Sequence, residues 1–278
     1  IMNRLFGFGD SFTQGHKLEV FFPPFVKWKE YCNGELPPVW IDLLGETLNM
    51  EVVNCGLAGM GNNEIFFTIC ENSHRFQKGD IVIINWSFMS RFRWAALNDH
   101  ATEPGFYDEH GNSQMIWRRF SANKTNGQYI KESTRDEIVT NRMFPIYFEE
   151  LRSFENIINS LADSIGFDVY YWALEDDMIY NSIPKDLVIR NKRFILGEEF
   201  YEMKKIYDRP LNRIGEGFVR LIKHHGGMDL HEETNGIVSD GHFGEIGNKV
   251  LYEMFLQHII KYKKNANVPT ISGNRKLI

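Results

Sequence analysis

The apolar run at residues 81–84 is the feature that most constrains the fold of this chain. It lies within the segment GDIVIINWSF and contains only isoleucine and valine. A continuous β-branched run of this kind, bounded by turn residues, is typical of a parallel strand that is buried on both faces. Such a strand needs helices on both sides of its sheet, so the run predicts an α/β protein.

Segments with strand and helix patterns alternate along the chain on both sides of this run. Further strands are expected at residues 4–8 and 167–174, and a short strand is expected to run into a glycine loop within EVVNCGLAG, residues 51–59. Helical periodicity appears in PPVWIDLLGETLNM, NNEIFFTICEN, FPIYFEELRSFENIINSLADSIG and EIGNKVLYEMFLQHIIKY. This alternation predicts a three-layer α/β fold, with a flavodoxin-like parallel sheet flanked by helices. The carboxyl ends of the strands then share one rim of the sheet, where open α/β folds bind their ligands.

We expect a single domain over residues 1–265 and a C-terminal tail over residues 266–278. The composition is that of a globular protein, with 43% hydrophobic and 24% charged residues. Two stretches, residues 98–141 and 175–213, lack a steady hydrophobic period. We interpret both as insertions into the domain, the first of them as an insertion or lid.

Charge and cysteine content restrict the classes of partner. The net charge of −6, without a basic stripe, argues against nucleic acid. We find neither a signal-peptide pattern nor an apolar run with a length of about 20 residues, so no membrane partner is expected. The three cysteines have no metal-type spacing, and their odd number favours a reducing compartment. A cytoplasmic protein, or one that joins a larger assembly through its C-terminal tail, fits these features.

The segment LFGFGDSFTQGH places Gly-Asp-Ser directly after the first expected strand. This is an ordinary turn composition, but it would also hold Ser11 as a nucleophile at the rim of the sheet. A nucleophilic serine needs a general base, a carboxylate that orients the base, and hydrogen-bond donors for the oxyanion. Asp240 and His242, in SDGHFGEIGNKV before the last helix, supply a carboxylate and an imidazole.

Together these segments resemble the SGNH hydrolases, also called the GDSL esterase and lipase family. The resemblance is carried by FGDSFTQG at residues 8–15, NCGLAG at residues 54–59 and DGHFGEIGN at residues 240–248. It implies the SGNH hydrolase fold, Ser11 as nucleophile, His242 as base and Asp240 as partner of the base, and it implies no cofactor. One residue separates Asp240 from His242, where the family more often has two, so a more distant acid is an alternative partner.

The oxyanion donors implied by the resemblance are the amides of Ser11 and Gly59 and one asparagine side chain. The chain departs from the family at this asparagine, because INWSFMSRFRW stands where the family has Gly-x-Asn-Asp. Asn62, close to Gly59, ranks slightly above Asn85, and Asn63 is a weaker candidate. Each of these asparagines could instead cap a helix or lie in a loop or strand.

Two residues near the rim, Arg91 and Trp86, are candidates for substrate contact, Arg91 for an anionic group. A rim arginine can equally form a structural ion pair. The cluster KHHGGMDLHEE follows no known metal-site spacing, so no metal site is expected.

The function predicted from these features is a serine ester hydrolase that removes a small acyl group, such as acetyl, from a carbohydrate. Its substrate would be a small acyl ester or an acylated glycan. The alternatives are an O-acyltransferase with the same triad, and a non-catalytic binding or structural module that retains the fold.

Overall fold

A computed structural model of the 278-residue chain describes residues 2–15, 23–87, 91–97, 115–121, 144–173 and 226–266. Its centre is a four-stranded sheet built from β1 (Arg4–Phe8), β2 (Glu51–Asn54), β3 (Ile81–Trp86) and β6 (Asp168–Ala173). All neighbouring strands are parallel, in the order β2-β1-β3-β6. The apolar run of β3 therefore lies inside the sheet, in the strand order expected of a flavodoxin-like fold.

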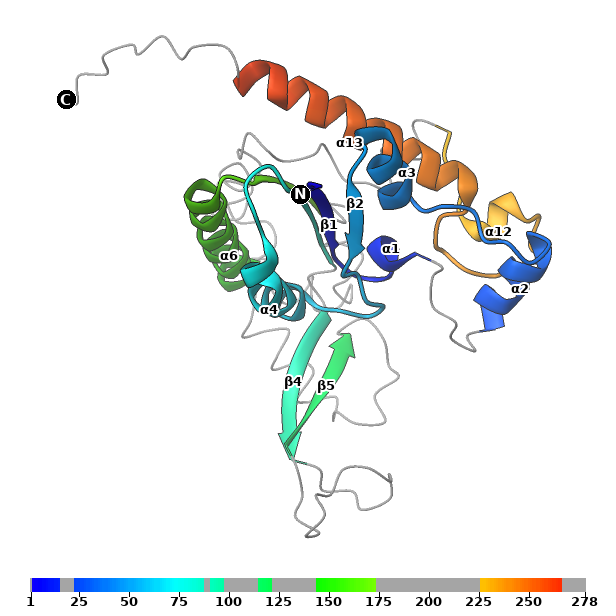
Figure 1. Ribbon diagram of the computed structural model, residues 1–278. Helices are drawn as coiled ribbons and strands as arrows, with labels where there is room; N and C mark the ends of the chain where they lie inside the picture. The colour runs from blue at the N-terminus through cyan, green and yellow to red at the C-terminus, as the bar shows by residue number, and fades with distance from the viewer. Residues whose placement is uncertain are drawn as a thin grey trace.

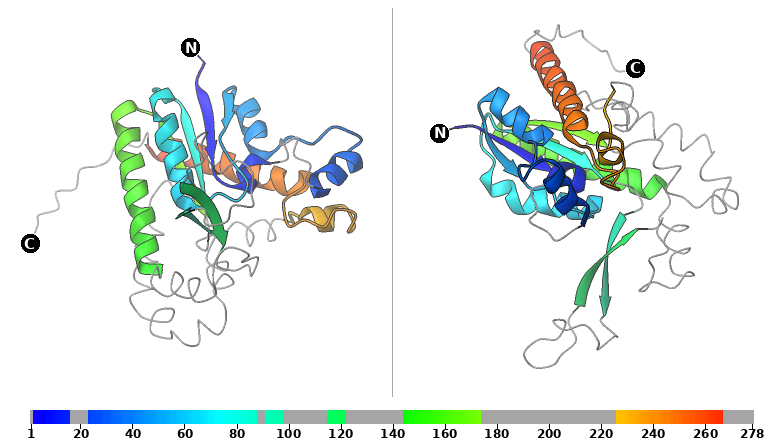
Figure 2. Two further views of the ribbon diagram at one scale, coloured as in Figure 1. Left: turned by 90° about the horizontal axis from the view of Figure 1, so that it is seen from below. Right: turned by 90° about the vertical axis from the view of Figure 1, so that its right-hand side faces the viewer.

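Helices cover both faces of this sheet (Figures 1 and 2). One face packs against α3 (Trp40–Leu48) and α13 (Glu245–Ala266), and the other packs against α4 (Asn62–Asn72) and α6 (Phe144–Ile165). These four helices coincide with the four segments of helical periodicity in the sequence. The predicted three-layer α/β fold is confirmed.

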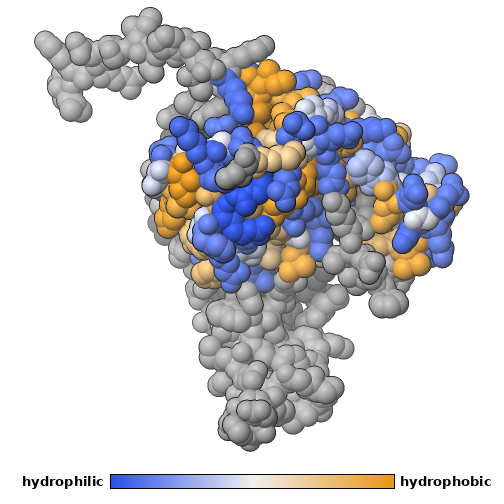
Figure 3. All heavy atoms as spheres, in the orientation of Figure 1, coloured by the Kyte–Doolittle hydropathy of each residue, from blue (hydrophilic) through white to orange (hydrophobic). Residues whose placement is uncertain are grey.

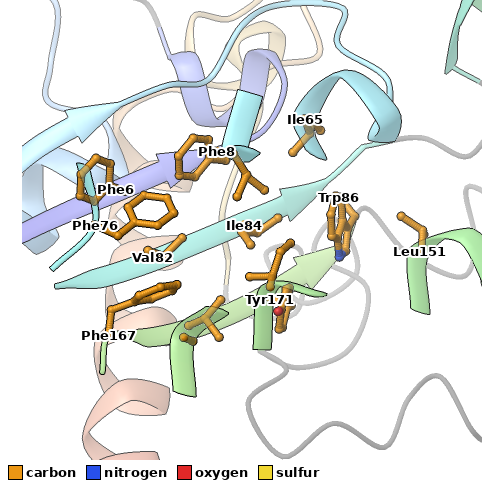
Figure 4. Close-up of a cluster of buried hydrophobic side chains, with 14 of the residues drawn as sticks. Phe6, Phe8, Ile65, Phe76, Val82, Ile84, Trp86, Leu151, Phe167 and Tyr171 are labelled. Atoms are coloured by element: carbon orange, nitrogen blue, oxygen red, sulfur yellow. The ribbon is translucent and has the colours of Figure 1, made fainter. Parts of the chain in front are cut away.

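Alternate residues of the strands supply two separate hydrophobic cores. The core under α4 and α6, shown in Figure 4, takes from β1 and β3 the side chains of Phe6, Phe8, Val82, Ile84 and Trp86. The core under α3 and α13 takes from the same strands Leu5, Ile81 and Ile83. This division follows from the period of two along a strand, which sends successive side chains to opposite faces.

Three further short helices and one 3-10 turn lie among the described residues. They are α1 (Ser11–Gln14), α2 (Pro23–Tyr31), α12 (Leu230–Glu233) and η1 (Ser73–Arg75). A small apolar cluster of Trp28, Leu230 and Val238 joins α2 to the segment that begins with α12. Through this cluster, residues far apart in the sequence meet at one end of the sheet.

A hairpin follows the central strand. Its strands, β4 (Arg91–Leu97) and β5 (Met115–Ser121), pair antiparallel, and Figure 1 shows them extending away from the sheet. β5 falls inside the expected insertion at residues 98–141, which the sequence pattern left without an element. The rest of that stretch, the expected insertion at residues 175–213 and the tail from residue 267 lie outside the described residues.

The described surface is mixed in character. In Figure 3, hydrophilic residues separate several smaller apolar areas on the face in view. Within the described ranges, the helices are too short or too polar to cross a membrane.

Candidate active site

Ser11 begins α1 where β1 reaches the rim of the sheet. Asp10 caps this helix, because its Oδ1 accepts a hydrogen bond from the Phe12 N–H at 3.1 Å. Ser11 is 8% exposed. Neither its hydroxyl nor its N–H has a hydrogen-bond partner among the described residues. Both groups are therefore available to a bound molecule.

The glycine loop after β2, residues 55–61, is held against α1 by hydrogen bonds. Asn54 Nδ2 donates to the Thr13 carbonyl at 2.8 Å, and the Ala58 N–H donates to Gln14 Oε1 at 2.7 Å. A Cβ on Gly56 would overlap Thr13 and the backbone nitrogen of Gln14. Only glycine allows the loop to approach α1 this closely.

Gly59 lies at the turn of the same loop. Its φ is +79°, a left-handed conformation that favours glycine. Like the N–H of Ser11, its N–H forms no hydrogen bond within the described part of the chain. Ser11 and Gly59 thus provide two backbone N–H groups on segments that hydrogen bonds hold together. Such N–H groups are usual components of an oxyanion hole.

The structure pairs His242 with Asp240. Nδ1 of the imidazole lies 2.5 Å from Asp240 Oδ1, and the same oxygen accepts the His242 backbone N–H at 3.1 Å. The tight turn made by this second bond allows a single intervening residue to suffice. Nε2 is buried and has no hydrogen-bond partner among the described residues. With Nδ1 on the carboxylate, Nε2 is the nitrogen that can accept a proton.

The histidine loop lies against α1 through the ring of Phe12. The ring centroids of Phe12 and His242 are 4.8 Å apart, and the ring of Phe25 in α2 lies 6.0 Å from the imidazole. Phe12 is itself fixed, because its carbonyl accepts the indole N–H of Trp40 at 3.0 Å. His242 therefore neighbours the residue that directly follows Ser11.

Two residues that the sequence did not single out hold this loop in place. Asn248 Nδ2 donates to the Phe243 carbonyl, and its Oδ1 accepts the Trp40 N–H, both at 3.1 Å. Glu233 Oε1 accepts the Glu245 N–H at 3.0 Å and so caps α13. Their sequence signal was weak, since polar residues are common in the first turn of a helix, where Asn248 lies, and Glu233 ends α12, 12 residues before the N–H that it caps.

Both candidate asparagines belong to a buried hydrogen-bond network at the rim. Asn62 Oδ1 accepts the Ser87 N–H at 2.6 Å, and its Nδ2 donates to the Ser87 carbonyl at 3.2 Å. Asn85 Nδ2 donates to Asp10 Oδ1 at 3.1 Å. Ser87 Oγ donates to Asp10 Oδ2 at 2.7 Å. The network connects the N-terminal cap of α1, the end of β3 and the start of α4.

The remaining candidates have other positions. Trp86 is fully buried, and its Nε1 donates to Glu155 Oε1 at 2.8 Å. The expectation that Trp86 contacts substrate is wrong, because the strand period sends this side chain into the core under α4 and α6. Arg91 begins β4, and its side chain lies outside the described residues. Asn63 Oδ1 accepts the Glu64 N–H at 3.0 Å, in the first turn of α4.

Other kinds of reactive group receive no support in the described ranges. Within these ranges, no group of three or more His, Cys, Asp or Glu could hold a metal ion, and His224 and His225 lie outside them. Cys32, Cys55 and Cys70 are free. Burial raises the pKa of each thiol, which lowers the fraction of nucleophilic thiolate.

Comparison with known proteins identifies similar structures. No family model and no curated protein matches the chain. A proposed lipolytic protein of the G-D-S-L family from Desulfitobacterium hafniense DCB-2 is 16% identical over 92% of this chain and 99% of its own, with a TM-score of 0.40. A member of the lipolytic protein G-D-S-L family from Veillonella parvula DSM 2008 is 16% identical over 91% and 96%, with a TM-score of 0.42. The chain resembles G-D-S-L family lipolytic proteins.

Proposed function

We propose that this protein is a serine ester hydrolase that acts through an acyl-enzyme and removes a small acyl group, such as acetyl, from a carbohydrate. The observation that carries the proposal is the Asp240–His242 pair, held against the residue that follows Ser11. A serine, an imidazole on a carboxylate and two unbonded backbone N–H groups are what acyl transfer requires.

The proposed reaction has two halves. His242 Nε2 takes the proton of the Ser11 hydroxyl as its oxygen attacks the ester carbonyl carbon, and Asp240 holds the resulting imidazolium. The N–H groups of Ser11 and Gly59 donate to the oxyanion. The bond to the alcohol then breaks, and His242 returns the proton to the departing oxygen. A water molecule repeats the attack on the acyl-enzyme, which releases the carboxylic acid and restores Ser11.

Asn62 is the proposed third donor to the oxyanion. Its support is its position at the start of α4, directly after the glycine loop that carries Gly59. Asn85 has less support, because it lies within β3 and not beside the glycine loop in the sequence. The Nδ2 of each asparagine already donates one hydrogen bond, to the Ser87 carbonyl from Asn62 and to Asp10 Oδ1 from Asn85, and each Nδ2 carries two N–H groups. The assignment of Asn62 can be tested separately from that of the nucleophile.

The proposed substrate is an acylated carbohydrate. Support comes from the aromatic content of 14% and from the partly buried rings of Phe12 and Phe25 beside His242, since aromatic rings are apolar surfaces on which a sugar can pack. Arg91 remains a proposed contact for an anionic substituent, since β4 follows β3 at the rim. The reaction as written needs no cofactor.

The test is a comparison of Ser11→Ala with the wild-type protein and with Ser160→Ala. Ser160 is a matched control, because its exposed hydroxyl only bonds the Asn156 carbonyl within α6. Hydrolysis of a chromogenic acetyl ester should be lost in Ser11→Ala alone, with the free energy of unfolding within about 1 kcal/mol of wild type. Equal turnover by wild type and Ser11→Ala would refute the proposal.

Substrate preference is measured with the same protein. Acetate release from acetylated oligosaccharides should exceed release of long-chain acids from matched esters. A product that forms only when an alcohol acceptor is added would instead identify an acyltransferase, which differs by excluding water.

A further inference from the structure

Ser87 lies at the centre of the rim network, although nothing in its sequence context drew attention to it. It follows the last residue of β3 and is 4% exposed. Its hydroxyl donates to Asp10, while both polar groups of its peptide backbone bond Asn62. One residue thus joins the helix that carries the proposed nucleophile to the helix that follows the glycine loop.

Asp10 transmits this contact to Ser11. It is fully buried and caps α1, and its carbonyl also accepts the N–H groups of Thr13 and Gln14, each at 3.0 Å. The Ser87 hydroxyl reaches Oδ2, whereas the Phe12 and Asn85 donors both reach Oδ1. A donor on each oxygen restrains rotation of the carboxylate and, through the cap, the first turn of the helix.

We propose that Ser87 is a positioning residue for the oxyanion hole, setting the orientation of the Ser11 N–H through Asp10 while its backbone sets Asn62. This inference rests on the proposed function. It also gives a role to the end of β3, where the family motif is missing from this chain. Oxyanion donors act only when they are oriented before charge develops, so a residue that fixes them affects turnover more than substrate affinity.

The experiment compares Ser87→Ala with Ser87→Thr and with Tyr171→Phe. Threonine keeps the hydroxyl. The Tyr171 hydroxyl donates to Asn159 Oδ1 at 2.9 Å in the α6 layer, so its loss removes a side-chain hydrogen bond without touching the rim. In ester hydrolysis, Ser87→Ala should lower kcat by about tenfold to 10²-fold with KM within about twofold of wild type. Ser87→Thr should recover most of this loss, and Tyr171→Phe should retain wild-type kcat.

A second variant covers the case in which Ser87→Ala does not fold. Ser87→Cys fills the same position with a slightly larger side chain but offers only a weak donor, so it should show the same loss of kcat. The inference is overturned if folded Ser87→Ala or Ser87→Cys keeps wild-type kcat. It is also overturned if KM rises while kcat is unchanged, or if Tyr171→Phe loses as much turnover.

Amide hydrogen exchange supplies a readout that does not depend on activity. Residues 12–15 should exchange faster in Ser87→Ala than in wild type or Tyr171→Phe, because the Asp10 cap is loosened. Unchanged exchange would overturn the positioning role. If the wild-type protein hydrolyses no ester at all, the proposed function fails, and the exchange data alone then decide whether Ser87 holds α1.

Discussion

At the residue scale, Asn85 and Asn62 hold different kinds of partner, so their loss should have different effects. Asn85→Ala removes one donor from the buried carboxylate of Asp10, although Oδ1 still accepts the Phe12 N–H. The expected result is a loss of about 1–3 kcal/mol in the free energy of unfolding, with kcat changed less than by Asn62→Ala. Urea unfolding and steady-state kinetics on the same preparation measure both quantities. A large loss of kcat without loss of stability would make Asn85 the oxyanion donor.

Asn62→Ala is expected to act on the reaction as well as on stability. Loss of a side-chain donor to the oxyanion should lower kcat by about 10²-fold or more, with KM little changed. Stability should also fall, because the buried Ser87 N–H loses its acceptor. If stability falls while kcat is retained, Asn62 is a purely structural residue of the rim.

Candidate residues were predictable from the sequence where a motif brings its own geometry. The Gly-Asp-Ser turn and the Asp-x-His turn are local, so Ser11, Asp240 and His242 could be chosen without the fold. Ser87 could not be chosen, because its partners lie 25 and 77 residues away in the sequence. Trp86 was misassigned although the needed signal was present, since the strand period already placed it in the same row as Ile84.

At the element scale, α13 depends on Glu233 for its first turn. Burial raises the pKa of the Glu233 carboxyl above its ordinary value, and the backbone hydrogen bond from Glu245 offsets this in part. The folded state therefore binds the Glu233 proton more tightly than the unfolded state does. The contribution of Glu233 to the free energy of unfolding is therefore largest at pH values below the ordinary glutamate pKa, and it is lost as the pH rises through the raised pKa.

Glu233→Gln should flatten this pH dependence. Glutamine keeps an oxygen for the Glu245 N–H but cannot ionise, so at neutral pH the variant should be at least as stable as wild type. Glu233→Ala, which lacks the acceptor, should be about 1 kcal/mol less stable than Glu233→Gln at any pH. Thermal unfolding from acid to neutral pH measures the difference. Equal destabilisation by Gln and Ala at neutral pH would contradict the assigned effect of burial.

Elements with a regular hydrophobic pattern were predictable, and elements without one were not. The expected bounds of β1 and α4 match the structure, because apolar residues recur regularly along each. The four residues of α1 are too few to show a helical period, and α1 forms because Asp10 caps it. β4 and β5 form strands because they pair with each other, and 17 residues separate them in the sequence. The local sequence of each segment therefore does not show that it is a strand.

At the scale of the whole molecule, the rim site depends on both cores. The glycine loop leads into α4 on one face of the sheet, whereas the histidine loop leads into α13 on the opposite face. β1 and β3 contribute side chains to both. Residues from opposite layers can therefore meet at the rim only while the sheet between them is intact.

This dependence predicts that the two cores unfold together. Ile83 faces the core under α3 and α13, and Ile84 faces the core under α4 and α6. Ile83→Val and Ile84→Val should each cost about 0.5–1.5 kcal/mol and shift one common unfolding transition. Tryptophan fluorescence reports on both sides, since Trp86 lies in one core and Trp40 in the other, and far-ultraviolet circular dichroism reports on the helices. The probes should give coincident midpoints in each variant, whereas two transitions, only one of them moved by each substitution, would mean that the layers are independent units.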